Sequence, residues 1–235
     1  VVISIAGDVI HEEVVDMLGK AFHCWRKGTP QAWYPANAEQ HQARWRVEPR
    51  DTEQAHLCLA VPGLPHCHPD RFTLDLLSVI LGEGMSSRLF LEIREKRGLA
   101  YAIHSYTDHF LDTGSLTIYA GIEPKHLPLA IGAILEELNR LKEGIPEREI
   151  FKAKELCKGR LLLQMEDTRS VSGWLGSQEL LLGEIFTIDQ IVSIIDSIQA
   201  GDLLRVAQDL LLGERLNLAI VGAVDNKSLE GLLQL

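Results

Sequence analysis

Apolar residues near the start of the chain form a short run and then recur at helical spacing. The run Val1–Asp8 has the composition of a buried strand that ends in a turn. A helix is predicted to begin near His11, and its apolar face consists of Val14, Met17, Leu18 and Phe22. Because a natural chain seldom begins inside a core strand and no initiator methionine is present, we expect a segment of a longer protein.

Alternating or continuous apolar stretches farther along the chain favour strands. Strands are predicted at Arg44–Val47 and at His56–Val61. The clearest hairpin pattern joins Ala100–Asp108 to Ser115–Ile122 through the turn residues 112–114, which are Asp-Thr-Gly. These segments predict a sheet with antiparallel neighbours.

Helices are predicted for much of the remaining chain, and several have recognisable starts. Proline suits the first turn of the helices that begin at Pro124 and Pro146, and Thr187 with Gln190 forms a capping box. The other expected elements are helices at 70–82 and 88–97 and a final strand at 216–221. Because strands and helices are mixed without strict βαβ alternation, the pattern predicts an α+β fold, an antiparallel sheet with helices packed on one face.

The segment from Arg26 to about Gln42 interrupts this pattern. It contains Gly28, Pro30 and Pro35 and has no sustained periodicity, which is typical of a linker. The length of 235 residues allows one large domain, or one domain with a piece of another.

Composition and charge narrow the range of partners. The chain has 46% hydrophobic and 24% charged residues, which excludes a disordered, collagenous or disulfide-stapled protein. Its formal net charge of −10 disfavours nucleic acid and anionic membranes as main partners. No apolar run approaches the roughly 18 residues that a membrane span needs. No targeting signal is visible, so we expect a cytoplasmic location unless an upstream signal precedes this sequence.

The cysteines give a second indication of compartment. Cys24, Cys58, Cys67 and Cys157 show no CxxC pairing. They are interpreted as reduced thiols in a cytoplasmic-type compartment.

A histidine-rich stretch raises the question of a metal site. His66, Cys67 and His68 are consecutive, His56 and Cys58 precede them, and imidazole and thiolate both suit zinc. Prolines flank the tract, however, and no standard ligand spacing appears. Surface histidines in a proline-rich turn are the favoured interpretation. The chain also contains neither His-Glu-x-x-His nor His-x-x-Glu-His.

The stretch from Gly82 to Ser87, Gly-Glu-Gly-Met-Ser-Ser, superficially resembles a phosphate-binding loop. It lacks the third glycine and follows a helix, whereas dinucleotide-binding loops follow a strand. It also lacks the Gly-Lys-Ser/Thr ending of a P-loop and the final glycine of a serine-hydrolase elbow. A tight connection between helices is therefore favoured.

Arg94 and Tyr101 flank a predicted helix end. Gly98 is placed to end the helix, and Tyr101 enters the next strand. One turn would bring a guanidinium and a phenol close together, where both can donate hydrogen bonds to a carbonyl or a developing oxyanion. From the pattern alone, a surface arginine and a half-buried strand tyrosine are the favoured interpretation.

Several stretches together resemble the signature of the insulinase (pitrilysin) family of zinc metallopeptidases, which includes the mitochondrial processing peptidases. The main stretch is Leu81–Phe90, continued by Ile93–Tyr101. Further similarity lies in Ile5–Asp8, Glu166–Ser170 and Leu180–Gly183, so the resemblance spans nearly the whole chain.

The resemblance implies a protein of two similar α+β domains that close as a clamshell, with the zinc motif in the N-terminal domain. Residues 1–25 would be the last strand and helix of the zinc-bearing domain, 26–42 the linker and 43–235 the C-terminal domain, which binds no metal. The implied partners are the missing N-terminal domain and a peptide substrate added along a sheet edge. A homodimer or heterodimer is a further possibility.

The resemblance also assigns roles to particular residues. Arg94 and Tyr101 would contact substrate backbone across the cleft, with Tyr101 supporting the tetrahedral intermediate. Zinc, held by the N-terminal domain, would polarise the scissile carbonyl and activate water for a glutamate base. No metal ligand is expected in this chain, which should hydrolyse nothing alone. A weaker correspondence with the glycine-rich loop of processing-peptidase subunits suggests a substrate loop of Gly82, Gly84, Ser86 and Ser87.

Three functions are therefore compared. The first is the substrate-binding half of a zinc endopeptidase that cleaves peptides or unfolded proteins, and the Arg94 and Tyr101 pair favours it. The second is a non-catalytic scaffold or partner subunit of the same fold, because the family also includes respiratory-complex core proteins. The third is an unrelated metal-binding module that uses His56, Cys58 and the histidines at 66 and 68.

Overall fold

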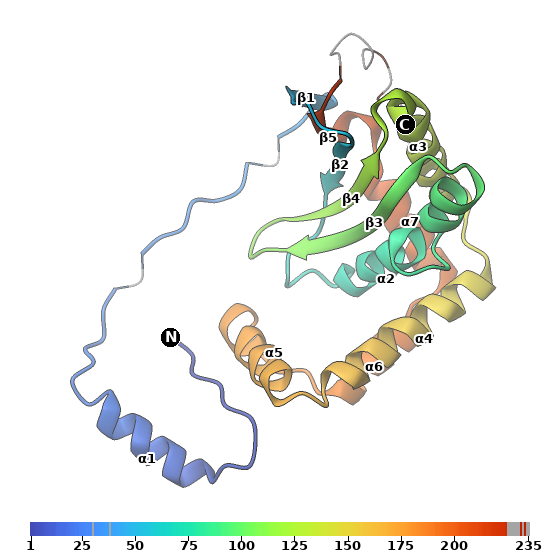
Figure 1. Cartoon of the computed structure of the whole chain (residues 1–235). Coiled ribbons are helices and arrows are strands. Elements are labelled where there is room, and N and C mark those ends of the chain that lie inside the picture. Colours follow the sequence, from blue (N-terminus) through green and yellow to red (C-terminus); the bar gives the residue numbers. More distant parts are fainter. Residues whose placement is uncertain (30, 38, 225–230, 232, 234–235) are drawn as a thin grey trace.

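A mixed sheet forms the centre of the computed structural model, which describes residues 1–29, 31–37, 39–224, 231 and 233. Within these residues the strand order is β1-β5-β2-β4-β3 (Figure 1). The strands are β1 (Arg44–Pro49), β2 (Ala55–Pro62), β3 (Ala100–His109), β4 (Gly114–Ile122) and β5 (Asn217–Gly222). The end of the expected C-terminal domain, 225–230, 232, 234 and 235, and linker residues 30 and 38 lie outside the described part.

The hairpin of β3 and β4 is confirmed, and β2 pairs antiparallel with the other side of β4. Leu57 lies opposite Ala120 and Leu59 lies opposite Ile118. These four side chains are at most 2% exposed, because the period of two along each strand places them on the same face.

The predicted antiparallel sheet is found at every pair of described strands except one, since β1 runs parallel to β5. β1 and β2 are consecutive and would make a simple hairpin, but β5 lies between them. β5 is antiparallel to β2, so it must run parallel to β1. Sequence patterns cannot reveal this insertion, because β5 comes from the far end of the described chain.

Helices α2 (Arg71–Gly82), α3 (Leu127–Glu143) and α7 (Ala200–Leu210) pack on one face of the sheet (Figure 1). This confirms the α+β class with helices on one face. The strand and helix side chains that point inward form one apolar core. Its largest fully buried members are Leu57, Leu59, Leu74, Leu76, Leu77, Leu81, Leu89, Ile93, Ile118, Ile122, Leu127 and Ile131.

A second group of helices lies outside α2. Lys154 of α4 donates hydrogen bonds to the carbonyls of Asp196 and Ile198 at 2.9 and 2.6 Å, which fixes α4 against the end of α6. The predicted capping box of Thr187 and Gln190 starts α6. The remaining helical elements are α1 (His11–Ala21), α4 (Glu147–Gln164), α5 (Thr168–Leu181), α6 (Ile188–Ser197), the π-helix η1 (Phe90–Lys96) and the 3-10 turns η2 (Pro124–His126) and η3 (Gly213–Arg215).

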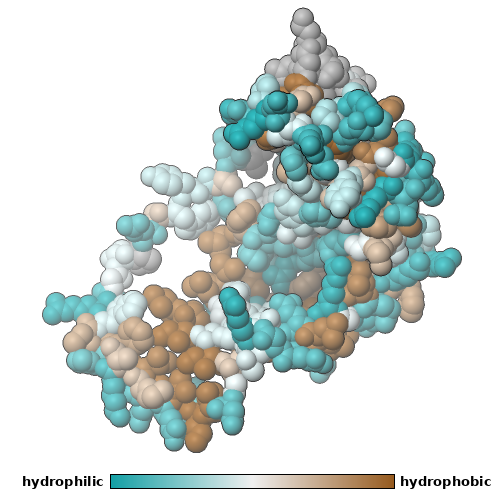
Figure 2. Space-filling view, viewed as in Figure 1, coloured by the Kyte–Doolittle hydropathy of each residue, from teal (hydrophilic) through white to brown (hydrophobic). Residues whose placement is uncertain are grey.

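The first residues form the predicted helix α1 but not the predicted strand. Val1–Asp8 is extended and largely exposed, because no described strand lies beside it to form a ladder. The segment instead contacts α5, where Ser172 donates from its hydroxyl to the carbonyl of Ser4 at 2.7 Å. α1 lies away from the sheet at the end of an extended connection (Figure 1), and apolar side chains gather on this part of the surface (Figure 2).

None of the described helices is long and apolar enough to cross a membrane.

The end of β3 is tied to α2 by a histidine–carboxylate pair. His109 donates from Nε2 to Asp75 at 2.9 Å and from Nδ1 to the carbonyl of Leu64 at 2.6 Å, if both ring nitrogens are protonated. The hydrogen bond with Asp75 raises the pKa of His109, while burial and Arg71 oppose the rise. The pair therefore stabilises the fold most when His109 is charged.

This pair predicts a specific pH dependence of stability. A raised folded-state pKa contributes stability that is complete below the unfolded value of about 6.5 and is lost as pH rises through the folded value. The difference in unfolding free energy between the unmodified protein and His109→Gln should thus be larger near pH 5.5 than near pH 8. Urea unfolding at both pH values measures it, with His11→Gln, an exposed histidine of α1, as the control. Equal differences in unfolding free energy at the two pH values would contradict stabilisation of the fold by charged His109.

Candidate functional site

Arg94 and Tyr101 lie on two consecutive elements at the edge of the sheet. Arg94 belongs to η1, and Tyr101 follows the first residue of the edge strand β3. Gly98 joins the two elements with a φ of +61°, a left-handed conformation that glycine adopts without strain. The prediction that this glycine ends the helix is confirmed.

η1 is a π-helix, and its hydrogen bonds show the wider winding. The amide of Arg97 donates to the carbonyl of Glu92 at 3.2 Å, five residues back. Leu89 and Ile93 are fully buried and anchor the helix to the core. Arg94, the next residue, is exposed. π-Helical turns are rare and occur frequently at functional sites.

The guanidinium of Arg94 lies over two aromatic rings. Its Cζ is 4.9 Å from the ring centroid of Phe90 and 6.0 Å from that of Tyr101. Both distances are within the range of a cation–π interaction, which leaves the N–H groups of Arg94 available at the ring edges. The sequence prediction that one turn brings these two side chains together is confirmed at this distance.

Neighbouring cations, in contrast, are engaged by carboxylates. Lys96 pairs with Glu92 at 2.7 Å, and Arg97 pairs with Glu92 at 3.3 Å and with Glu136 at 2.6 Å. Hydrogen bonding to Lys96 lowers the pKa of Glu92, and hydrogen bonding to Glu136 raises the pKa of Arg97. Within the described chain no ion pair involves Arg94. It therefore remains a free donor for an external acceptor.

A β-bulge displaces Tyr101 from the regular ladder. Ala100 lies opposite Ile122 and Ala102 opposite Gly121, so Tyr101 is the extra residue between them. A bulge changes the direction of a side chain and is common next to active sites. Tyr101 is 75% exposed, so its hydroxyl is accessible.

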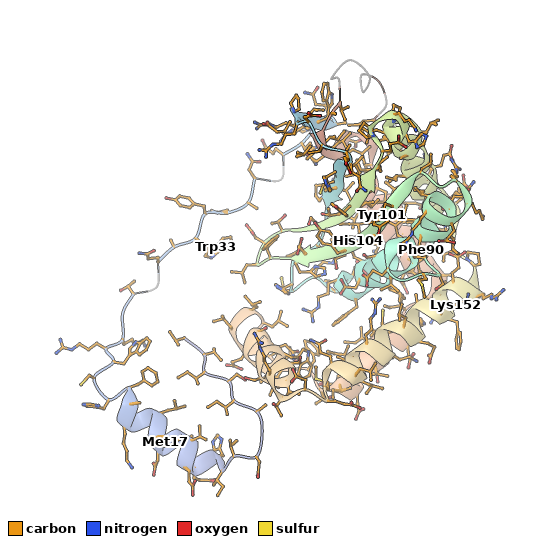
Figure 3. The ribbon with its side chains drawn as sticks, viewed as in Figure 1. Met17, Trp33, Phe90, Tyr101, His104 and Lys152 are labelled. Carbon is orange, nitrogen blue, oxygen red and sulfur yellow. The ribbon has the colours of Figure 1, made fainter. Side chains whose placement is uncertain are left out.

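The face of the sheet opposite the helices carries an aromatic cluster that the sequence analysis did not identify. His56 and Tyr119 are joined by a 2.8 Å hydrogen bond, and the ring of His104 lies 5.1 Å from that of Tyr119 and 6.0 Å from that of Tyr106. Figure 3 shows His104 on the same strand as Tyr101. Alternation along the strands, combined with the register, would have grouped these side chains.

The segment Gly82–Ser87 is a connection between helices, as predicted. Gly82 is the buried last residue of α2, and Gly84 has a φ of +86°. Ser87 is buried and donates to the carbonyl of Gly84 at 2.7 Å, whereas Ser86 is exposed. The two serines border a hollow of about 650 Å³ beside α4, which neither Arg94 nor Tyr101 lines. The structure thus places this loop at a hollow that the arginine–tyrosine pair does not line.

The four residues of the alternative metal-binding hypothesis lie in two separate places. His56 and Cys58 are near the start of β2, while His66 and His68 follow its end. A strand from His56 to Pro62 spans about 20 Å. Among the described residues, no group of three or more histidines, cysteines or acidic side chains could hold a metal ion. The hypothesis of a module built from these four residues is therefore wrong.

Comparison with known proteins identifies the family. The model of the peptidase M16 inactive domain matches residues 1–157. An uncharacterized zinc protease of Streptomyces coelicolor is 37% identical over 233 residues, which cover 96% of this chain and 50% of that protein. This chain spans about half the length of the curated relatives that it matches.

Solved structures show the same fold. A protease from Helicobacter pylori is 24% identical with a TM-score of 0.82, over 92% of this chain and 53% of that one. A chain of complex III2 from Candida albicans, with Inz-5 bound, is 21% identical with a TM-score of 0.79, over 97% and 55%. Since the family model matches well over half of the residues, the chain belongs to the peptidase M16 family and corresponds to its inactive domain.

Proposed function

We propose that this chain is the substrate-binding C-terminal half of a zinc-dependent endopeptidase that cleaves peptides or unfolded proteins. The observation that carries the proposal is the pairing of two exposed hydrogen-bond donors, Arg94 and Tyr101, at the edge of the sheet. A π-helix and a β-bulge, two irregularities typical of functional sites, present them. The zinc-protease relative named above supports the same assignment.

The chemistry of the pair suits a peptide backbone. The guanidinium of Arg94 donates to a substrate carbonyl, and the phenol of Tyr101 donates to the carbonyl oxygen that becomes an oxyanion during hydrolysis. A donor aimed at a developing oxyanion accelerates reaction because its hydrogen bond strengthens in the transition state. The stacking of Arg94 over Phe90 restricts the guanidinium before substrate arrives.

Zinc does not fit this half of the protein. The sequence contains no His-x-x-Glu-His or His-Glu-x-x-His motif, and the described side chains form no cluster of three or more candidate ligands. We therefore assign the zinc to the missing N-terminal domain. The activity of this chain is then limited to binding and orienting the peptide.

Residues 1–25 are proposed to belong to that N-terminal domain, 26–42 to the linker and 43–235 to the C-terminal domain. The exposed apolar side chains of the first segment support this division. Val1 is 94% exposed, Met17 63% and Trp25 61%, and Phe22 with Trp25 lines a hollow of about 700 Å³. Apolar surface of this extent marks an interaction site, which the remainder of the N-terminal domain would cover.

The test is peptide hydrolysis by the full-length protein, with and without a chelator, beside this chain alone. The proposal requires zinc in the full-length protein, cleavage that the chelator abolishes, and no cleavage by the isolated chain. Metal-dependent cleavage by the isolated chain, lost on mutation within it, would overturn the division of roles.

A non-catalytic scaffold or partner subunit is the second candidate, and the similarity to a chain of complex III2 favours it. It predicts a full-length protein that binds no zinc and cleaves no peptide. The same experiment therefore separates the two candidates.

A further inference from the structure

A third hollow, of about 680 Å³, lies where α5 approaches the start of α2 and the first half of α6. Its volume is within the range of pockets that hold small ligands, about 300 to 1,000 Å³. Neither Arg94 nor Tyr101 lines it, so the proposed peptidase function does not involve it. Figure 1 shows α5 beyond the end of α4, facing the part of the fold that contains α2.

A buried donor without a partner marks this hollow. Gln178 of α5 is 7% exposed, and its Oε1 accepts a 3.0 Å hydrogen bond from the amide of Phe186. Its Nε2 has no partner anywhere in the described chain, although it is buried. An unsatisfied buried donor costs about 1–3 kcal/mol, so the side chain favours an acceptor brought by a ligand.

Two guanidinium groups make the same hollow a site for an anion. Arg71 is partly buried beside the carbonyl of His66, to which it donates at 2.9 Å, and burial lowers its pKa. Arg169 is exposed and makes no ion pair with a described residue. The one lining carboxylate, Asp167, already accepts from the amide and the hydroxyl of Ser170, both at 2.8 Å. The lining is thus cationic in a chain whose net charge is −10.

Part of the remaining wall is apolar, beside the polar side chains of Gln164 and Ser177. The apolar side chains come from α2, from α5 and the residue that follows it, and from α6, and they are Phe72, Trp174, Leu181, Leu182 and Ile191. The guanidinium of Arg71 is stacked at 4.3 Å over the ring of Phe72, so the cationic and apolar parts of the wall are adjacent. A ligand that suits both must carry an anionic acceptor on an apolar body.

We propose that this hollow binds a carboxylate attached to an apolar group, the chemistry of a peptide's C-terminal residue with a hydrophobic side chain or of a free hydrophobic carboxylic acid. The carboxylate accepts from Gln178 Nε2 and from the guanidinium groups of Arg71 and Arg169. The apolar group lies against Trp174 and its neighbours. Charge-assisted hydrogen bonds to a guanidinium give the carboxylate its specificity over a neutral amide.

The test is calorimetric titration of the full-length protein with N-acetylphenylalanine, its amide, and 3-phenylpropionate. The acid should bind at least tenfold more tightly than the amide, and binding should reach saturation below about 10 mM. Tighter binding of N-acetylphenylalanine than of 3-phenylpropionate indicates a peptide terminus, and equal binding indicates a free acid. Equal affinity for acid and amide, or no binding in this range, would refute the proposal.

Two variants locate the site on the protein. Gln178→Glu keeps the shape and the oxygen that accepts from Phe186 but replaces the donor with a carboxylate oxygen, so affinity should fall at least tenfold. Arg169→Met should weaken binding of the acid and leave the amide unaffected. Arg148→Met is the matched control, because Arg148 is an exposed arginine of α4 that lines the separate hollow beside Ser86 and Ser87. Unchanged affinity in both test variants would exclude this hollow even if the acid binds elsewhere.

Because the readout is binding, its failure and the failure of the peptidase proposal can be told apart. The ligands contain no internal peptide bond between two amino acids for an endopeptidase to cleave. If the protein hydrolyses peptides but does not bind N-acetylphenylalanine, the peptidase proposal stands and the carboxylate-binding proposal is refuted.

Discussion

Replacing Tyr101 with phenylalanine in the full-length protein should lower kcat/KM for peptide hydrolysis by about a hundredfold, the loss expected when one donor to an oxyanion is removed. The loss should lie mainly in kcat, because this hydrogen bond is strongest in the transition state. Arg94→Ala should also lower kcat/KM, with a larger share in KM, because a contact to an unreactive carbonyl binds ground state and transition state alike.

Both variants are expected to fold normally, which keeps the kinetic comparison valid. Tyr101 is 75% exposed and Arg94 is also exposed, and surface substitutions usually change stability by less than about 0.5 kcal/mol. Tyr34→Phe, at a linker tyrosine that is 97% exposed, is the control for tyrosine, and Arg148→Ala is the control for arginine. Activity equal to that of the controls would show that Arg94 and Tyr101 take no part in the hydrolysis.

Gly82→Ala should destabilise the protein by about 3 kcal/mol, the upper part of the usual range for an overpacked core. A Cβ at this position would lie 2.5 Å from the backbone nitrogen of Ser105 and 2.6 Å from its Oγ. The serine cannot turn away at low cost, because its hydroxyl donates to the carbonyl of Ser78 at 2.8 Å and the site is buried. Helix α2 must therefore move off strand β3. Urea unfolding measures the loss.

Gly132→Ala in α3 is the matched helical substitution. No heavy atom lies within 4 Å of the added Cβ, so only helix propensity changes, and stability should rise by about 0.5–1 kcal/mol. A loss of stability in Gly82→Ala and a gain in Gly132→Ala would show why a side chain is excluded at position 82. The reason would be the close approach of β3, and not a general effect of replacing glycine in a helix. A neutral Gly82→Ala would contradict the close approach of β3 to the end of α2 at this position.

These glycines show where sequence reasoning stops. The pattern identified Gly82 as the end of a helix and, through the family resemblance, as part of a substrate loop. It could not show that the backbone of β3 passes at this point, because Ser105 is 23 positions away and the contact depends on how the helix crosses the sheet. The substrate loop itself remains a proposal, now with a packing role for its first glycine.

For the arginine–tyrosine pair, the sequence and the tertiary structure supplied different information. Its residues and spacing were visible in the sequence, and the resemblance supplied their role. The π-helix and the bulge that expose them were not visible in the sequence. A π-helical hydrogen bond spans one residue more than an α-helical one, and a bulge inserts one extra residue into a strand, and neither has a local sequence pattern. Likewise, the cationic hollow beside α5 joins residues from 66 to 191, and no local pattern links them.

The sequence by itself determined most of the helices and strands, the α+β class and the family, because periodicity, capping and motif spacing are local properties of the chain. It placed the hairpin of β3 and β4, the capping box at Thr187 and the helix end at Gly98 correctly. Only the tertiary structure decided that β5 separates β1 from β2, that Val1–Asp8 forms no strand, and that Gln178 is a buried donor without a partner. Each of these depends on contacts between segments distant in sequence, and their free energy is set by packing and desolvation.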